Sequence, residues 1–438
     1  MSLGPPGLLI AAPASGSGKT LLTLALLRHL RSRGTRVAAI KVGPDYIDPA
    51  FHAAASGRPC FNLDTWAMRP ATVGALAARA GANAELLLGE GVMGLFDGAP
   101  DGSGSTADLS VATGWPVILV IDSKGMANSA AALLHGFATF RPEVAVVGAI
   151  FNRVGSASHG ERLSAACAPL GLRLLGALPK DPRLVLPERH LGLVQAGEHP
   201  GLDDFLDQAA ALVAEHLDID ALVALARPGP APSGEAASCL PVLGQRIAVA
   251  RDQAFAFVYE AQLAGWQAAG AALTFFSPLA DQAPDLDADA VFLPGGYPEL
   301  HGARLASATT FLTGLRQAAD RGAAIYGECG GYMVLGERLE DGEGESHPMA
   351  GLLPLETSFA KPRLTLGYRS LEAIEAGPLG PRGSRFRGHE FHYARTARAG
   401  EGAALFRISD SQGRDLGPTG LSRGRVAGSF VHLVDRAG

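Results

Sequence analysis

The sequence predicts two doubly wound α/β domains joined by a linker, and three observations support this fold class. Apolar runs that read as buried strands alternate with helical patterns in both halves of the 438-residue chain. A stretch rich in Pro, Gly and Ser separates the halves, which is typical of a linker. The length also exceeds one ordinary hydrophobic core. We therefore expect an N-terminal domain over residues 1–226, a linker over 227–244 and a C-terminal domain over 245–438.

The composition indicates a packed, soluble protein, with 47% hydrophobic and 18% charged residues. A net charge of −6 argues against nucleic acid as a partner. No apolar run approaches the roughly 18 residues that a membrane span needs, and the N-terminus lacks a signal-peptide pattern. The four cysteines have neither zinc nor disulfide spacing. We therefore expect a cytoplasmic protein without a membrane partner.

The first predicted strand, residues 8–12, leads into a loop of small residues that opens a helix. Gly16 and Gly18 allow the backbone N–H groups to curl around phosphate oxygens, and the helix N-terminus adds positive potential there. In such a phosphate-binding loop Lys19 reaches the β- and γ-phosphates and the Thr20 hydroxyl binds Mg²⁺. Pro13 replaces the usual first glycine of the motif. The predicted nucleotide site is formed by Ser15, Gly16, Ser17, Gly18, Lys19 and Thr20.

Polar residues follow the later predicted strands of the same half, at residues 36–41, 85–88, 117–121, 144–151 and 174–178. Because the strands alternate with helices, the sheet is expected to be parallel, with ligands at the carboxyl ends of its strands. We therefore expect one active site at this edge. Its candidate residues are Lys41, Asp45, Tyr46, Asp48, Glu90, Asp97 and Asn152.

The second half contains a candidate nucleophile, Cys329, between a predicted strand at 323–326 and a helix at 332–337. Flanking glycines permit the sharp turn that lifts a nucleophile above a sheet, and a helix N-terminus lowers the pKa of a thiol. The N–H groups of Gly330 and of the segment around Gly296 are the candidate oxyanion hole. For the base, the sequence favours His432, near the end of an apolar run at 428–433. The competing histidines are His389 and His392, whose spacing is not that of a zinc protease.

Together these motifs resemble the cobyrinic or hydrogenobyrinic acid a,c-diamide synthase family over nearly the whole chain. The N-terminal half resembles the dethiobiotin-synthetase type of P-loop fold, and the C-terminal half resembles a class I glutamine amidotransferase. The segments that carry the resemblance are residues 15–20, 41–49, 90–98, 295–299, 327–331, 388–393 and 429–432.

The resemblance implies a two-site reaction on L-glutamine, ATP–Mg²⁺ and a corrinoid polycarboxylate. Cys329 attacks the glutamine side-chain amide and releases ammonia, while His432 moves the protons. ATP phosphorylates a corrin carboxylate, and ammonia then displaces phosphate; phosphorylation supplies the leaving group that a carboxylate lacks. The implied roles are Mg²⁺ binding for Thr20, Asp45 and Glu90, phosphate neutralisation for Lys19 and Lys41, corrinoid handling for Tyr46, Asp48 and Asp97, and adenine binding for Asn152.

The chain departs from class I amidotransferases at two places. Tyr332-Met333 stands where His-Gln is common, and Val434 stands where a Glu two residues after the base is usual. We therefore expect a Cys–His pair whose imidazole is oriented by another group, and slow glutamine hydrolysis without the other substrates.

The motifs leave several alternatives open. A cobyric acid synthase or a Ni-sirohydrochlorin a,c-diamide synthase would carry the same motifs, and composition alone favours metal-free hydrogenobyrinic acid over the cobalt form. A partition-type P-loop ATPase switch is disfavoured because Ala14 replaces its signature lysine. Binding of a corrinoid without catalysis would leave Cys329 idle. The sequence does not tell whether the chain forms a homodimer, in which order the amides form, or how ammonia travels.

Overall fold

The computed structural model describes residues 4–189, 192–229 and 239–437, and the chain divides into two compact units. The first unit comprises Met1–Trp66 and Pro70–Ala236, and the second comprises Ala67–Arg69 and Ala237–Gly438. Residues 230–238 of the expected linker lie outside the described residues. The first two linker residues form a short strand, β10 (Arg227–Pro228), which pairs with β1 (Pro6–Ala11).

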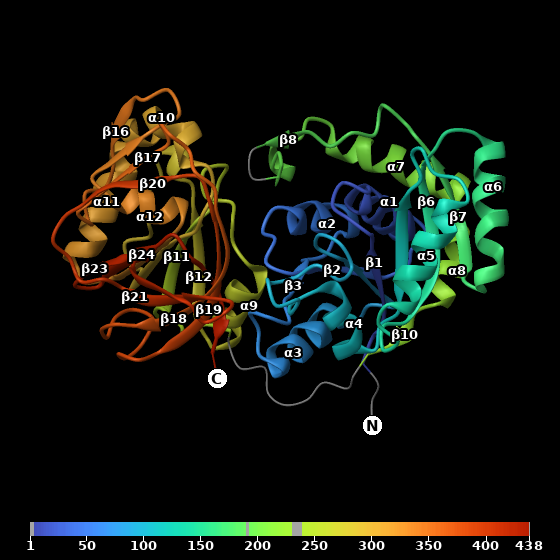
Figure 1. The fold of residues 1–438 in the computed structure, drawn as a ribbon. Helices are drawn as coiled ribbons and strands as arrows, with labels where there is room; N and C mark the ends of the chain where they lie inside the picture. Colours follow the sequence, from blue (N-terminus) through green and yellow to red (C-terminus); the bar gives the residue numbers. More distant parts are fainter. Residues whose placement is uncertain (1–3, 190–191, 230–238, 438) are drawn as a thin grey trace. The chain divides into compact units, whose positions relative to one another are not determined.

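The first unit is built on an eight-stranded sheet whose main path runs β3-β2-β4-β1-β5-β6-β7, with all neighbours on this path parallel (Figure 1). Its strands β1, β2, β4 and β5 are almost wholly buried, as expected where helices cover both faces of a parallel sheet. The predicted doubly wound fold is confirmed. The strand bounds are β2 (Val37–Val42), β3 (Phe61–Leu63), β4 (Leu86–Glu90), β5 (Val117–Asp122), β6 (Val146–Val154) and β7 (Arg173–Pro179).

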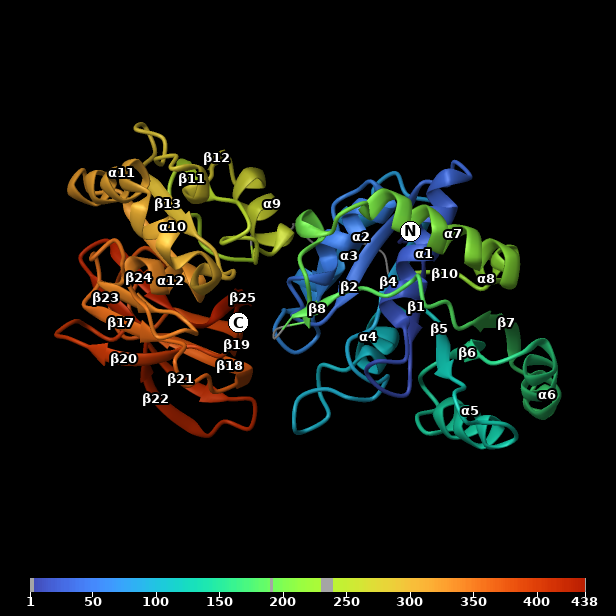
Figure 2. The same ribbon diagram turned by 90° about the horizontal axis from the view of Figure 1, so that it is seen from above.

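Helices connect these strands, and the order β2-β4-β1-β5 places the ends of β2, β4 and β1 next to one another. Helices α1, α2 and α7 contact one another, and α5 contacts α6 (Figure 2). Helix α1 begins at Lys19, directly after the glycine-rich loop. The helix bounds are α1 (Lys19–Ser32), α2 (Asp48–Ser56), α3 (Pro70–Ala80), α4 (Thr106–Thr113), α5 (Ser129–Thr139), α6 (Ala157–Cys167), α7 (Leu202–His216) and α8 (Ile219–Ala224).

The second unit contains a six-stranded sheet in the order β12-β11-β13-β14-β24-β23, parallel except for β23. Buried apolar side chains such as Val291, Ile325 and Phe311 form its core. The strand bounds are β11 (Arg246–Ala250), β12 (Ala272–Phe276), β13 (Ala290–Leu293), β14 (Ala324–Glu328), β23 (Leu421–Arg423) and β24 (Val426–Ser429). The helix bounds are α9 (Glu260–Ala268), α10 (Gly302–Ser307), α11 (Thr309–Asp320) and α12 (Gly330–Leu335).

Two further sheets in this unit were not expected from the sequence. One is five-stranded and antiparallel, in the order β22-β21-β18-β19-β25, and the other is four-stranded, in the order β16-β15-β17-β20. The bounds are β15 (Arg338–Glu340), β16 (Ser346–Pro348), β17 (Leu355–Ser358), β18 (Thr365–Ala373), β19 (Arg385–His392), β20 (Arg395–Ala399), β21 (Phe406–Asp410), β22 (Asp415–Thr419) and β25 (His432–Arg436).

The position of His432 differs from the sequence expectation of one continuous strand. The chain leaves the parallel sheet after Ser429, and His432 begins β25 in the antiparallel sheet, opposite His389 of β19. The base candidate therefore lies where the chain passes from one sheet to the next. Within the described ranges, no helix combines the length and apolar character that crossing a bilayer requires.

Candidate active sites

The glycine-rich loop of the first unit has the backbone geometry that phosphate binding requires. Gly16 and Gly18 have φ values of 74° and 93°, in the left-handed region that favours glycine. A Cβ on Gly18 would lie 2.2 Å from Nδ2 of Asn152, whose amide donates to the Ser17 carbonyl at 2.9 Å. Asn152 therefore faces the loop, and Gly18 cannot be replaced without displacing it.

The first two residues of α1 turn toward the end of β4. The Lys19 ammonium donates to the Met93 carbonyl at 2.6 Å and to the Ala14 carbonyl at 3.3 Å. The Thr20 hydroxyl donates to Oε1 of Glu90 at 2.6 Å. Burial lowers the pKa of Lys19, and the Glu90 carboxylate opposes this effect. An anion bound at the loop would favour the charged ammonium in the same way.

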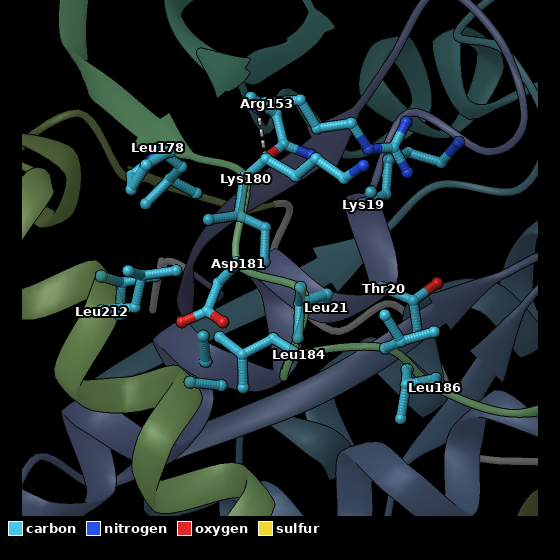
Figure 3. A pocket seen from close by; sticks show the side chains of 18 of the residues that line it. Lys19, Thr20, Leu21, Arg153, Leu178, Lys180, Asp181, Leu184, Leu186 and Leu212 are labelled. Atoms are coloured by element: carbon cyan, nitrogen blue, oxygen red, sulfur yellow. Dashed lines mark hydrogen bonds between the residues drawn. The ribbon is translucent and has the colours of Figure 1, made fainter. Parts of the chain in front are cut away.

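A pocket of about 370 Å³ adjoins the loop within the first unit (Figure 3). This volume falls within the range of about 300–1,000 Å³ that is usual for small-molecule sites. Polar groups line one part of the pocket and leucines from the segment after β7 and from α7 line another. Its lining includes Gly16, Lys19, Thr20, Asn152, Arg153, Leu178, Lys180, Asp181, Leu184, Leu186 and Leu212.

Lys41 lies at the centre of a buried charge cluster at the end of β2. Its ammonium is 2.5 Å from Oδ2 of Asp48, 2.9 Å from Oε1 of Glu90 and 3.7 Å from Oδ2 of Asp45. Burial opposes the charge on Lys41, but the three carboxylates raise its pKa well above the usual value. Burial, followed by repulsion from Asp45, raises the pKa of Asp48 to about 7. The structure thus brings together four residues that the sequence placed at this edge.

Glu90 is the second centre of this cluster, and its partners include a residue that the sequence analysis missed. Oε2 of Glu90 is 2.6 Å from Nε2 of His52, whose Nδ1 is 2.6 Å from the Asp48 carbonyl. Burial would raise the pKa of Glu90, but Lys41 and then His52 lower it well below its usual range. His52 lies four residues after Asp48 on α2, and this spacing was the available signal because such residues share a helix face.

The remaining predicted residues of this unit have local roles in the structure. Oδ1 of Asp45 accepts the N–H groups of Ile47 and Asp48, which shapes the start of α2. Oδ2 of Asp97 accepts the Gly94 N–H at 2.9 Å and so holds the loop after β4. Tyr46 is buried, whereas Ser15 is exposed on the glycine-rich loop.

In the second unit, Cys329 occupies a strained turn between β14 and α12. Its φ is 47°, an uncommon value for a residue with a side chain. The turn depends on close backbone approach, because a Cβ on Gly331 would lie 1.9 Å from the Leu293 carbonyl oxygen. Helix α12 begins directly after Cys329, and the Met333 N–H donates to the Cys329 carbonyl at 3.1 Å in its first turn. This is the geometry of a nucleophile elbow.

The side of Gly295 that lacks a side chain faces both Cys329 and His432. A Cβ built on Gly295 would be 3.2 Å from Cβ of Cys329, and 2.4 Å and 3.0 Å from Cε1 and Nε2 of the His432 imidazole. A Cβ built on Gly330 would lie 3.0 Å from the Gly296 nitrogen, so the two oxyanion-hole candidates are neighbours. Of the competing histidines, His392 stacks on Phe430 with ring centroids 4.2 Å apart.

Burial holds the groups around the thiol in their neutral forms. Burial, and then the Glu299 carboxylate, raise the pKa of the Cys329 thiol far above its usual value. Burial lowers the pKa of His432 to about 3, and His389 acts in the same direction. Burial also raises the pKa of Glu328, the residue before Cys329, to about 8. At neutral pH the unliganded site therefore favours a thiol and a neutral imidazole over an ion pair.

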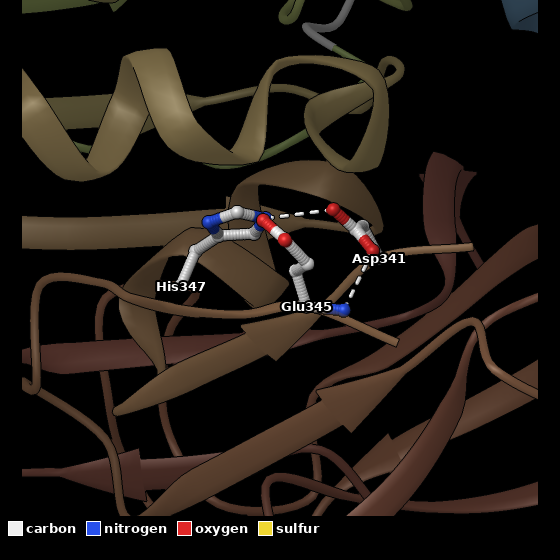
Figure 4. Close-up of side chains that lie close together, drawn as sticks. All are labelled: Asp341, Glu345 and His347. Carbon is white, nitrogen blue, oxygen red and sulfur yellow. Dashed lines mark hydrogen bonds and ion pairs between the residues drawn. The ribbon is translucent and has the colours of Figure 1, made fainter. Parts of the chain in front are cut away.

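A separate group of potential metal ligands, Asp341, Glu345 and His347, lies in the hairpin between β15 and β16 (Figure 4). Oδ1 of Asp341 accepts the N–H groups of Glu343 and Glu345, and Oδ2 is 2.8 Å from Nε2 of His347. These bonds close the turn, and they account for the arrangement without a bound ion.

Comparisons with known proteins cover both units. Residues 8–194 match the family described as CobQ/CobB/MinD/ParA nucleotide binding domain, and residues 246–437 match CobB/CobQ-like glutamine amidotransferase domain. The chain is 56% identical over 436 residues to the hydrogenobyrinate a,c-diamide synthase of Brucella suis biovar 1, covering 99% of each chain. It is 54% identical to the enzyme of that name from Rhodobacter capsulatus, covering 99% of this chain and 100% of the relative.

Proposed function

Because the chain belongs to the hydrogenobyrinate a,c-diamide synthase family, we propose that it converts the a and c carboxylates of hydrogenobyrinic acid to amides with ATP and glutamine. One observation carries this proposal: the same chain holds a phosphate-binding loop beside a buried acidic cluster and, in its second unit, a cysteine elbow beside a histidine. An amide ligase that takes its nitrogen from glutamine needs both sites. The name of these relatives supplies the substrate.

In the second unit, Cys329 is the nucleophile that takes the glutamyl group, and His432 is the base and acid. The thiol proton passes to the imidazole as sulfur attacks the side-chain amide, and the imidazole returns a proton to the departing ammonia. The Gly296 and Gly330 N–H groups receive the oxyanion. Their adjacency supports the oxyanion roles, and the approach of both Cys329 and His432 to the same point beside Gly295 supports their pairing.

Burial of the cysteine and the histidine supports slow glutamine hydrolysis in the absence of the other substrates. A thiolate requires loss of a proton from Cys329, whose pKa is raised by burial, to His432, whose pKa is lowered by burial to about 3. Both shifts oppose formation of the ion pair. The same two shifts favour slow cleavage of glutamine by this pair.

In the first unit, the glycine-rich loop holds the ATP phosphates and Lys19 and Lys41 neutralise their charge. Thr20, Glu90 and Asp45 offer the hard oxygen ligands that suit Mg²⁺, and the first two already meet at 2.6 Å. A bound Mg²⁺ would neutralise charge on the transferring phosphoryl group. Asn152 lines the nucleotide pocket, and Tyr46, Asp48 and Asp97 remain the candidates for handling the corrinoid carboxylate, activated as an acyl phosphate.

The proposal is tested by amidation of hydrogenobyrinic acid with either glutamine or free ammonia as nitrogen donor. Cys329→Ala is expected to lose the glutamine-dependent reaction and to keep the ammonia-dependent one. The product mass should correspond to two added amides, whereas more than two would identify a cobyric acid synthase. If hydrogenobyrinic acid and its cobalt form both fail to stimulate ATP hydrolysis by the wild-type enzyme, the substrate assignment is wrong.

The setting of the reaction is part of the same proposal. We place it in the cytoplasm, where ATP is supplied and where thiols stay reduced. All four cysteines are free and buried, which is compatible with that compartment.

A further inference from the structure

The imidazole of a Cys–His pair needs a partner on its second nitrogen, and the usual position for that partner holds an apolar residue here. Val434 stands two residues after His432 and is buried. A base that takes a proton on one nitrogen must keep the other protonated and must be held in one orientation. The partner therefore has to come from another part of the unit.

The carboxyl group that faces the imidazole belongs to Glu328, the residue directly before the nucleophile. Oε2 of Glu328 is 3.9 Å from Nδ1 of His432, and Oε1 accepts the Leu433 N–H at 3.0 Å. Both side chains are almost completely buried, with exposed fractions of 1–2%. The bond to the Leu433 N–H fixes the carboxyl group against the strand that carries His432.

Local backbone structure explains why a residue next to the nucleophile can reach the base. Glu328 is the last residue of β14, which pairs in parallel with β24, and Glu328 lies opposite Ser429. Successive residues of a strand point to opposite faces, and the turn at Cys329 then redirects the chain. The side chains of residues 328 and 329 therefore diverge, and His432 lies near both.

We propose that Glu328 is the positioning residue of the glutamine site: its carboxylate accepts the Nδ1 proton of His432 and leaves Nε2 to take the thiol proton of Cys329. This inference rests on the proposed function. In the unliganded structure Glu328 and Nδ1 are separated by more than a hydrogen bond, as is common before the reacting complex forms. A closure of about 1 Å would bring them to a hydrogen-bond distance of about 2.9 Å.

The proton inventory of this arrangement is balanced. One proton passes from Cys329 to Nε2 as the thioester bond forms, and the same proton leaves with ammonia. The Nδ1 proton stays on the ring, donated to Glu328, which gains no proton in the step. The carboxylate stabilises the imidazolium while it exists.

The environment of Glu328 gives the inference a pH signature. Burial raises its pKa to about 8, whereas the Leu433 N–H acts to lower it. A raised carboxyl pKa means that the orienting carboxylate forms only as the pH rises through about 8. The other titratable groups near this site are Tyr326 on the same strand, Cys329, His432, Glu299, His389, His392 and Glu390.

The test compares Glu328→Gln, Glu328→Asp and Glu375→Gln, a matched change at an exposed glutamate of the same unit. Glu328→Gln keeps the size of the side chain and an acceptor for the Leu433 N–H but cannot carry the charge. Its glutamine-dependent kcat is expected to fall by about 10²–10⁴-fold, as for loss of the orienting acid in other triads. The KM for glutamine and the ammonia-dependent rate should stay within a few fold of wild type, and Glu375→Gln should match wild type throughout.

Two further measurements separate positioning from a structural role. The rise of glutamine-dependent kcat/KM through about pH 8 in the wild type should be lost in Glu328→Gln, and Glu328→Asp should restore part of the rate. Alkylation of Cys329 by iodoacetamide should slow in Glu328→Gln, and this readout needs no substrate.

Three outcomes would overturn the inference. The first is a Glu328→Gln enzyme that keeps the wild-type glutamine-dependent rate and pH profile. The second is an equal loss of the glutamine-dependent and ammonia-dependent reactions in this variant, and the third is an unchanged rate of Cys329 alkylation in it. A wild-type enzyme without glutamine-dependent amidation would instead refute the proposed function. The alkylation measurement would still test whether Glu328 affects Cys329, because it needs no substrate.

Discussion

Replacing Gly295 by alanine should separate the two halves of the reaction, because the new methyl group would enter the space between nucleophile and base. The added Cβ would lie 2.4 Å from Cε1 of His432. An ordinary carbon–carbon contact is about 3.5 Å or more, so the imidazole must move by about 1 Å. A misplacement of about 1 Å can cost about 10²-fold in rate, which corresponds to about 2.7 kcal/mol of transition-state stabilisation.

The assay is glutamine-dependent against ammonia-dependent amidation by the full-length enzyme. Gly295→Ala should lose about 10²-fold in the first and nothing in the second. The matched control is Gly377→Ala in the same unit, since a Cβ at Gly377 meets nothing within 4 Å. A Gly295→Ala enzyme that uses glutamine as well as the Gly377→Ala enzyme does would refute the assignment of His432 as the partner of Cys329.

Two further predictions concern the first unit. Gly18→Ala should weaken ATP binding and lower the glutamine and ammonia reactions equally, because the new Cβ would lie 2.2 Å from Nδ2 of Asn152. The control is Gly34→Ala, since Gly34 has a similar φ of 83° and a Cβ there would meet nothing within 4 Å. Unchanged ATP affinity in titration calorimetry would contradict the placement of the nucleotide. His52→Ala should cost about 1–3 kcal/mol in the free energy of unfolding because it removes a buried partner of Glu90. Chemical denaturation measures this loss against His135→Ala, an exposed site on α5, and equal stabilities would count against the cluster.

Sequence patterns predicted the parallel sheets well because each of their strands is a local property of the chain. A buried parallel strand is a short apolar run, and the strand predicted at 117–121 matches β5 (Val117–Asp122) to within one residue. The glycine-rich loop was equally readable, since a left-handed φ at Gly18 requires a glycine at that position. Such features need no knowledge of distant residues.

The antiparallel sheet and the change of sheet before His432 were not predictable in this way. The segment from Ser429 to Leu433 is mostly apolar and is typical of one strand, but His432 pairs with β19 and so belongs to a different sheet. Which sheet a strand joins depends on partners far away in the sequence. The pairing of residues 432 and 389 is such a long-range choice.

The same limit explains why the partners of Glu90 and His432 escaped notice. The spacing of His52 from Asp48 places the two on one helix face, but only the packing of α2 against β2 brings His52 to Glu90. Glu328 was visible within the cysteine motif, but its role depends on the distance to a residue more than a hundred positions later. Pattern reasoning proposed the reacting groups from local motifs, whereas the groups that contact them are defined by tertiary structure.

Burial has opposite results in the two sites, because the charged neighbours of the buried groups differ. Lys41 is surrounded by three carboxylates, so it stays charged although it is buried, and an ammonium is present before any substrate binds. For Cys329, His432 and Glu328 burial is the largest influence on the pKa, and it favours the neutral form of each. In the proposed phosphate site, the Lys41 ammonium and the carboxylates around it offer fixed charges to a nucleotide and a divalent cation. A glutamine site that is active without an acceptor would release ammonia into water, and burial that favours the neutral thiol and imidazole acts against that loss.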